Sequence, residues 1–192
     1  MKRALIAVAA LVAVGGIVLA AQDMGGKGQE PPQMPPMPKA SKEHEVLKEG
    51  VGTWDYVMKF KMGPDAPEQE VKGVETITML GEFWNIFDIK TDNMMGMKWH
   101  GHGTLGYDAD KKKYIGTFIE NMGPHRMLGE GTMEGKVLTM IWDGIDHETG
   151  KPGKMKEVSE RKDKDNGTMV MTKIGADGKE SPMFSITYTR KK

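Results

Sequence analysis

Residues 52–62, GTWDYVMKFKM, decide the fold, because apolar side chains occupy every second position of this stretch. The apolar positions are Trp54, Tyr56, Met58, Phe60 and Met62. Successive side chains of a β-strand point to opposite faces, so an alternation sustained over the whole stretch predicts a strand with one apolar face.

The same alternation continues to the end of the chain, interrupted by turn residues. Nine further candidate strands are residues 70–79, 82–90, 97–107, 113–120, 125–133, 136–142, 155–162, 168–174 and 183–190. Glu134-Gly135, Asn166-Gly167 and Asp177-Gly178 are dipeptides typical of tight hairpins. Links this short leave no room for crossover helices. We therefore expect an all-β fold, a single antiparallel up-and-down β-barrel of about ten strands.

A different pattern precedes the strands. Lys2 and Arg3 are followed by an apolar run over residues 4–19 and by small residues at 18 and 20, which is typical of a Sec-type signal peptide. Residues 1–20 are thus predicted to direct the protein to the periplasm or outside the cell, with no stable membrane span after cleavage; the alternative is an uncleaved anchor.

The rest of the N-terminal segment divides into two parts. Residues 21–40 form a Pro/Gly/Met-rich segment that we interpret as a linker. The barrel domain is expected over residues 41–192. Ser41 fits a helix N-cap and Gly50 a helix stop, which predicts a short helix over residues 43–49.

Composition excludes several classes of protein. The chain has no cysteine, which rules out disulfides, thiol nucleophiles and thiolate metal sites. Its 27 basic and 27 acidic side chains balance, and loss of Lys2 and Arg3 with the leader would leave it slightly acidic, so no basic field attracts nucleic acid. HExxH, GxSxG and P-loop motifs are missing, which leaves an activity uncertain but favours a non-enzymatic protein without a cofactor.

Motifs at several places resemble a known family. The triplet at residues 52–54, GTW, together with Tyr188-Thr189-Arg190, is similar to the signature of the calycins, the lipocalin and fatty-acid-binding-protein superfamily. The segments EHEVLKEGVGTWDY, MGMKWHGHGTLGYDADKKKYIGTFIENMG and ITYTRK resemble the domain of unknown function 1579 family. The resemblance implies a secreted or periplasmic bacterial calycin-like barrel in which Arg190 lies over Trp54 and helps to close the barrel. It implies no activity.

Two histidines raise the possibility of a metal site. His100 and His102 are two residues apart and so share one face of a predicted strand, opposite Trp99, Leu105 and Tyr107. The larger apolar set should face the barrel interior, which leaves both histidines outside. Copper or zinc binding would need a third ligand from elsewhere. A metal- or haem-binding barrel that uses these histidines, or His44 and His125, with methionine assistance therefore stays an alternative hypothesis.

The favoured hypothesis is a barrel that binds a small apolar or amphipathic molecule. Methionine is abundant, with 18 residues, and its alternate spacing indicates a deformable inner face. The side chains expected to line the interior or to pack beneath its lining are Trp54, Tyr56, Met58, Phe60, Trp99, Leu105, Phe118 and Met127.

Two other hypotheses remain open. One is an interaction domain whose barrel is filled. The other is an enzyme with a polar lumen built around Asp88, Glu120 or Asp143, which requires that these carboxylates converge. Asp143, Asp146, His147 and Glu148 occur among glycines and a proline, which predicts an exposed hairpin loop around them.

Overall fold

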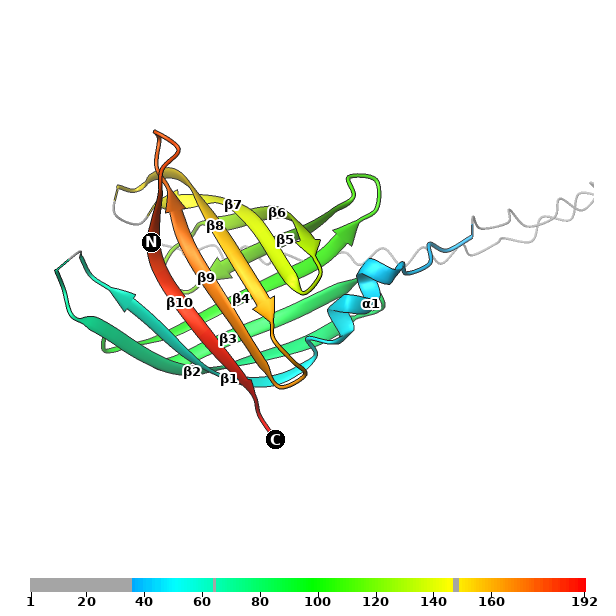
Figure 1. Cartoon of the computed structure of the whole chain (residues 1–192), viewed down its shortest axis with the longest axis horizontal. Coiled ribbons are helices and arrows are strands. Elements are labelled where there is room, and N and C mark those ends of the chain that lie inside the picture. The colour runs from blue at the N-terminus through cyan, green and yellow to red at the C-terminus, as the bar shows by residue number, and fades with distance from the viewer. Residues whose placement is uncertain (1–35, 64, 147–148) are drawn as a thin grey trace, which may run out of the picture. The chain divides into compact units, whose positions relative to one another are not determined.

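The chain folds into a closed antiparallel barrel in the computed structural model, which describes residues 36–63, 65–146 and 149–192. One helix, α1 (Lys42–Lys48), precedes ten strands in these residues (Figure 1). The strands are β1 (Gly52–Lys61), β2 (Glu68–Leu80), β3 (Trp84–Met94), β4 (Met97–Asp108), β5 (Lys113–Glu120), β6 (Arg126–Glu134), β7 (Val137–Asp146), β8 (Lys151–Arg161), β9 (Asn166–Ile174) and β10 (Glu180–Arg190). Each strand pairs with its neighbours in sequence, and β1 pairs with β10 to close the sheet. The all-β, ten-stranded fold predicted from the sequence is confirmed.

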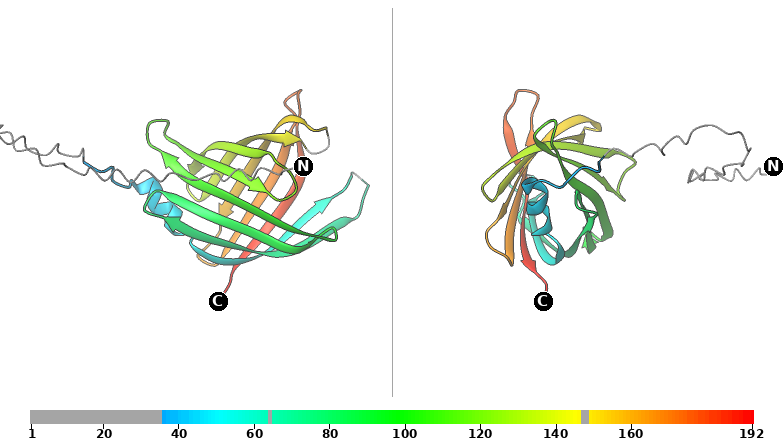
Figure 2. Two further views of the ribbon diagram at one scale, coloured as in Figure 1. Left: turned by 180° about the vertical axis from the view of Figure 1, so that it is seen from behind. Right: turned by 90° about the vertical axis from the view of Figure 1, so that its right-hand side faces the viewer.

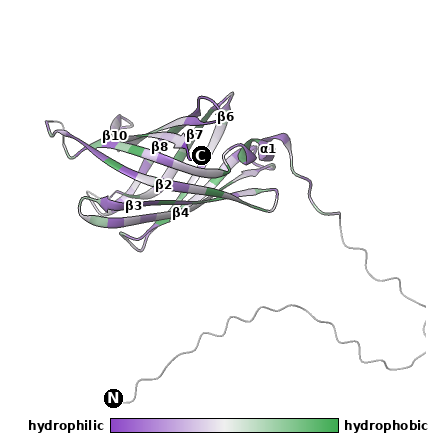
Figure 3. Cartoon of the chain, turned by 90° about the horizontal axis from the view of Figure 1, so that it is seen from below, coloured by the Kyte–Doolittle hydropathy of each residue, from purple (hydrophilic) through white to green (hydrophobic). Residues whose placement is uncertain are grey.

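The alternation that predicts the strands is also what separates the inside of the barrel from the outside. On β1, Trp54, Tyr56 and Met58 are buried, whereas Asp55 and Lys59 are exposed. Figure 3 shows apolar and polar segments following one another in colour along individual strands. Each strand thus contributes one row of side chains to the interior and one row to solvent.

Glycines on β4 let aromatic side chains of neighbouring strands lie against the backbone. A Cβ atom at Gly103 would collide with the ring of Phe87 on β3 and with the carbonyl oxygen of Thr117 on β5. At Gly101 it would collide with the ring of Phe118. The glycine-rich run of β4 is therefore a packing feature of the inner wall.

Helix α1 lies at one end of the barrel (Figure 2). Its Leu47 belongs to a buried apolar cluster with Leu138 and Met140 of β7. The side-chain amide of Asn85 donates a hydrogen bond of 3.2 Å to the carbonyl of Leu47, and the Tyr114 hydroxyl donates one of 3.3 Å to the carbonyl of Glu43. We call this end of the barrel the helix end. The other end, which carries the β1–β2, β3–β4, β5–β6, β7–β8 and β9–β10 links, is called the far end.

The prediction of an exposed loop around residues 143–153 is wrong in its extent. β7 continues to Asp146 and β8 begins at Lys151, with Gly144 opposite Gly153 and Ile145 opposite Pro152 in the ladder. Pro152 lies at the start of its strand, before the β8–β9 ladder begins at Lys154, so its missing N–H interrupts no bond of that ladder. His147 and Glu148 lie outside the described residues.

The leader predicted over residues 1–20 also lies outside the described part of the chain. Of the linker predicted over residues 21–40, the structure describes only the last five residues. Within residues 36–63, 65–146 and 149–192, no helix is long and apolar enough to cross a membrane.

Candidate functional site

The interior of the barrel holds a cavity of about 1520 Å³ that is partly open to solvent. Small-molecule sites commonly have volumes of roughly 300–1,000 Å³, so the space suffices for a ligand of considerable size. Seven of the residues predicted for the interior border it, namely Trp54, Met58, Phe60, Trp99, Leu105, Phe118 and Met127. Tyr56 points to the same side but does not border the cavity, because it is buried against Gly73 of β2. The presence of this cavity contradicts the hypothesis of a filled barrel.

Methionine supplies a large part of the cavity wall. The methionines that border the cavity are Met58, Met62, Met94, Met95, Met122, Met127, Met133, Met140, Met155, Met169, Met171 and Met183. Methionine side chains are unbranched and polarizable, so they can adapt their rotamers to ligands of different shape. A wall of this composition suits ligands of different shape.

Arg190 connects the last strand to the first strand and to the residues after α1. Its guanidinium carbon lies 4.0 Å from the ring centroid of Trp54, a cation–π contact. The same guanidinium donates hydrogen bonds to the carbonyls of Val51 and Glu49, at 2.6 and 2.9 Å. The Trp54 indole donates to the carbonyl of Gly50 at 2.9 Å. These contacts hold the β1–β10 junction at the helix end, which is the structural role that the resemblance to the calycins implies.

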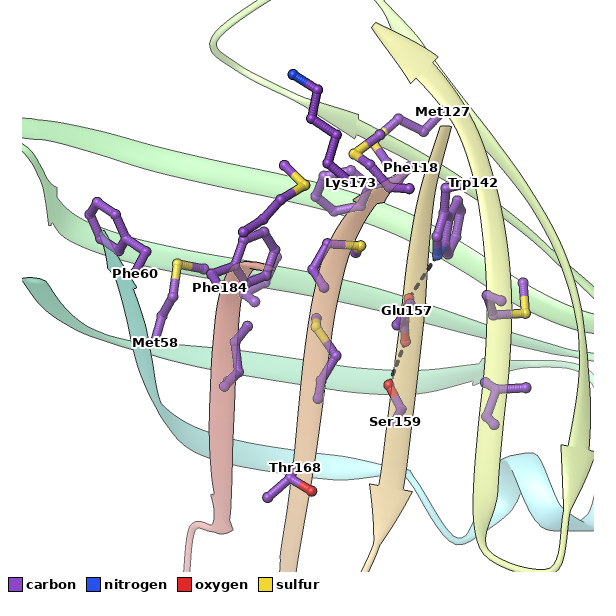
Figure 4. A pocket seen from close by; sticks show the side chains of 18 of the residues that line it. Met58, Phe60, Phe118, Met127, Trp142, Glu157, Ser159, Thr168, Lys173 and Phe184 are labelled. Atoms are coloured by element: carbon purple, nitrogen blue, oxygen red, sulfur yellow. Dashed lines mark hydrogen bonds between the residues drawn. The ribbon is translucent and has the colours of Figure 1, made fainter. Parts of the chain in front are cut away.

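One carboxyl group in the cavity wall is held by two hydrogen bonds. Glu157 of β8 accepts a hydrogen bond from the Trp142 indole of β7 at 2.8 Å and another from the hydroxyl of Ser159 (Figure 4). Burial raises the pKa of Glu157, and the two hydrogen bonds counteract part of this effect. All three side chains border the cavity.

A second carboxyl group, that of Glu75 on β2, borders the cavity without a partner among the described residues. Glu75 occupies an inward position between Trp54 of β1 and Ile89 of β3. Protein surrounds its carboxyl group. This burial, with a smaller contribution from the charge of Glu157, raises the pKa of Glu75 to about 8. At neutral pH the side chain is therefore mostly an uncharged carboxylic acid.

Tyr188 of β10 joins these carboxyl groups in the polar part of the wall. Burial raises its pKa well above the ordinary value, and the charges of Glu75 and Glu157 raise it further. Both carboxyl groups thus lie close enough to Tyr188 to act on it. We refer to Glu75 and Glu157 as the inner carboxyl pair.

The two adjacent histidines lie on the outside of the barrel, as the alternation predicts. Nε2 of His100 and Nδ1 of His102 lie 2.8 and 3.2 Å from the same Asp88 oxygen on β3. We call these three residues the outer histidine cluster. In the described part of the chain, no group of three or more histidine and carboxylate side chains is arranged to hold a metal ion.

The remaining histidines proposed as ligands also lie away from the cavity. His44 is buried in α1, where Nδ1 accepts a hydrogen bond of 3.0 Å from the backbone N–H of Ser41 and the ring packs edge-on against Phe83 and Tyr107. His125 is exposed in the link between β5 and β6. None of the described histidines borders the cavity. A haem site that uses an imidazole inside the barrel is therefore not built from them.

The three carboxylates proposed for an enzyme do not converge, and that hypothesis is wrong in its choice of residues. Asp88 faces outward in the outer histidine cluster, and Asp143 pairs with Lys154 on the outer surface. Only Glu120 borders the cavity, where it accepts a hydrogen bond of 2.7 Å from the Trp99 indole. Two further carboxyl groups that border the cavity, those of Glu75 and Glu157, were not predicted from the sequence.

A signal for Glu75 and Glu157 is nevertheless present in the sequence. Glu75 is separated by even numbers of residues from Val71 and Met79, and Glu157 by two from Met155. All of these positions have the parity of the inner face. Applying the alternation to charged residues as strictly as to apolar ones would have placed both inside.

A closed up-and-down barrel of ten strands, with a short helix at one end and a large internal cavity, defines a calycin-like barrel. The chain belongs to the family of proteins of unknown function DUF1579, whose sequence profile matches residues 39–190.

A solved structure shows the same fold at low sequence identity. The crystal structure of Rv2717c from M. tuberculosis is similar with a TM-score of 0.57 and 12% identity, over 80% of this chain and 100% of that one. A redesigned β-barrel, b11L5F_LGL, matches with a TM-score of 0.41 and 14% identity, over 76% of this chain and 95% of that one. No protein of curated function matches the sequence.

Proposed function

We propose that this protein binds a small apolar or amphipathic molecule inside its barrel. The observation that carries the proposal is the cavity of about 1520 Å³, whose wall is rich in methionine and aromatic side chains. An apolar molecule in a cavity of this size gains many packing contacts with the side chains of the wall. A barrel closed by Arg190 and Trp54 supplies a rigid frame, and the methionines supply the adaptable surface.

The far end is the proposed opening for the ligand. Met62, Met95 and Met122 lie in links at this end, border the cavity and are 68%, 55% and 50% exposed. Exposed apolar side chains around an opening favour the passage of an apolar molecule from the surface to the interior. At the opposite end, α1 packs across the barrel through Leu47.

Export belongs to the same proposal. The leader expected over residues 1–20 would bring the barrel into the periplasm or outside the cell. A water-insoluble compound needs a carrier to cross such an aqueous space. No cofactor is part of this proposal.

Uptake of N-phenyl-1-naphthylamine, an uncharged dye whose fluorescence rises in apolar surroundings, tests the proposal. We expect saturable uptake with one class of site, and the variant Met169→Trp should weaken it several-fold by filling part of the cavity. Val170→Trp is the matched control, because Val170 is the next residue of β9, faces outward and is 42% exposed. Absence of saturable uptake by the folded protein would refute the proposal.

A further inference from the structure

The inner carboxyl pair is the feature of the cavity that a purely apolar ligand does not explain. A hydrocarbon would be served better by apolar side chains at these positions, because burial of a carboxyl group without full compensation is unfavourable. Glu157 has two hydrogen-bond donors, whereas Glu75 has no hydrogen-bond or ion-pair partner in the part of the chain that the structure describes. The cavity thus contains an enclosed carboxyl group whose hydrogen-bonding capacity is unused.

No cationic side chain among the residues that the structure describes compensates this pair. Burial and the charge of Glu157 raise the pKa of Glu75. No lysine or arginine contributes to the pKa shift of either carboxyl group. Lys173, at the far end of β9, forms an ion pair of 2.9 Å with Asp146. Nη1 of Arg161, at the helix end of β8, lies 3.7 Å from Oε2 of Glu49. The part of the cavity wall that the inner carboxyl pair forms is therefore neutral or negative, depending on pH, and not positive.

We infer that the ligand is an amphiphile with a protonated amine head, which Glu75 and Glu157 hold while its apolar body lies against the methionine wall. This inference rests on the proposed function. An ammonium group donates up to three hydrogen bonds, which suits two carboxylates and the nearby hydroxyls of Tyr188 and Ser159. A fatty-acid carboxylate beside Glu75 and Glu157 is disfavoured, because it would meet two further acidic groups there and no cation acts on either of them.

Binding of such a cation is coupled to the release of protons. The raised pKa of Glu75, about 8, means that the free protein holds a proton there at neutral pH. An ammonium group beside the carboxyl favours its ionised form, so the proton leaves when the ligand binds. Affinity for the amine should therefore rise with pH through the pKa of Glu75, as long as the amine itself stays protonated up to roughly pH 10.

Displacement of N-phenyl-1-naphthylamine by three ligands with the same alkyl chain tests the inference. We expect dodecylamine to displace the dye at a concentration at least tenfold lower than dodecanol or dodecanoate requires, at about pH 9. Calorimetry of dodecylamine binding in two buffers of different ionisation enthalpy should show proton release near pH 7 and none above the pKa of Glu75.

The variant Glu75→Gln with Glu157→Gln should lose the preference for dodecylamine while its affinity for dodecanol stays unchanged. Glutamine keeps the size of the side chain and, at position 157, one acceptor oxygen in place of the two that Trp142 and Ser159 use in Glu157. The single variant Glu75→Gln, which disturbs no hydrogen bond present in the structure, should lose most of the preference. The control Glu130→Gln with Asp143→Asn removes two outer carboxylates and should keep it, since these bind Lys111, Lys113 and Lys154 on the surface.

The outcomes separate the inference from the proposed function. Dye uptake without a preference for dodecylamine, or a preference that survives in Glu75→Gln with Glu157→Gln, overturns the amine inference alone. Absence of dye uptake overturns the proposed function and the inference with it. Loss of the preference in the control variant would show that the amine is attracted by the surface, which also overturns the inference.

Discussion

Glu75 and Asp88 lie almost side by side in the sheet, yet the barrel gives them opposite chemistry. They stand on neighbouring strands, where Ile89, next to Asp88, is opposite Glu75 in the β2–β3 ladder. Glu75 faces inward, and burial raises its pKa to about 8. Asp88 faces outward, and the hydrogen bond from His100 is the main cause that lowers its pKa.

In this barrel, the face of the sheet on which a residue lies decides the chemistry of its side chain more than the residue type does. The outer histidine cluster is conspicuous in the sequence, but its members satisfy one another in contact with water. The inner carboxyl pair is inconspicuous in the sequence, but it borders the cavity and lacks a cation. Variants with substitutions on the inner or the outer face can therefore test whether the two faces differ in this way.

The largest expected effect comes from adding a side chain to the inner face of β4. Gly103→Val places a Cβ atom where the Phe87 ring and the Thr117 carbonyl already lie, so we expect a loss of about 3 kcal/mol in the free energy of unfolding. His102→Val, one residue away on the outer face, should change it by less than about 0.5 kcal/mol. Urea denaturation of both variants measures the difference. Equal losses would show that the two faces are not as distinct as the structure has them.

The fold could be predicted from the sequence because its signals are local. The alternation from Trp54 to Met62 and the hairpin dipeptides at Glu134, Asn166 and Asp177 each act over a few residues. The error around residues 143–153 has a physical reason. Glycine and proline usually interrupt strands, but here Gly144, Pro152 and Gly153 pair within the β7–β8 ladder at its far end. Pairing with a partner strand outweighed the local preference.

The candidate site could be predicted only in part. The parity of β1 and β4 places Trp54 and Trp99 inside and His100 outside, and the structure has them there. Parity does not say that Glu75 and Glu157 act on one another, because β2 and β8 are distant in sequence and are not paired in the sheet. Their interaction depends on barrel closure, and the cavity volume depends on how all inner side chains pack. Neither is a local property.

A smaller effect is expected from neutralising Glu75. Its pKa is raised from 4.5 to about 8, so its contribution to stability is fully present below pH 4.5 and is lost as pH rises through about 8. Glu75→Gln should remove this loss and stabilise the protein by about 1–2 kcal/mol above the pKa, because water in the cavity screens part of the penalty. At pH values below 4.5 the variant and the original protein should have the same stability. Denaturation curves over a pH series measure the two slopes.

Asp88→Asn is the matched control for that measurement, and its sign is opposite. The lowered pKa of Asp88 gives a contribution that is present above pH 3.8 and is lost as pH falls through the pKa of the folded state. The control should therefore be slightly less stable than the original protein at neutral pH and should leave the slope between pH 4.5 and 8 intact. If Glu75→Gln and the original protein gave parallel curves in that range, Glu75 would not be the enclosed acid that the structure places in the cavity.

The smallest effect is expected when both histidines of the outer cluster are replaced. The side chains of His100 and His102 are 45% and 42% exposed and face away from the cavity, so His100→Gln with His102→Gln should leave dye affinity unchanged. Stability should change by no more than about 0.5 kcal/mol, because exposed pairs contribute little.

The same variant tests the alternative of a metal-binding barrel. A bound copper or zinc ion would need both imidazoles together with further ligands, so the histidines would be essential for metal content. Elemental analysis of both proteins, purified without chelators, should find equal amounts of copper and zinc. If the original protein contained a metal that the variant had lost, the outer face would hold the binding site that we assign to the interior.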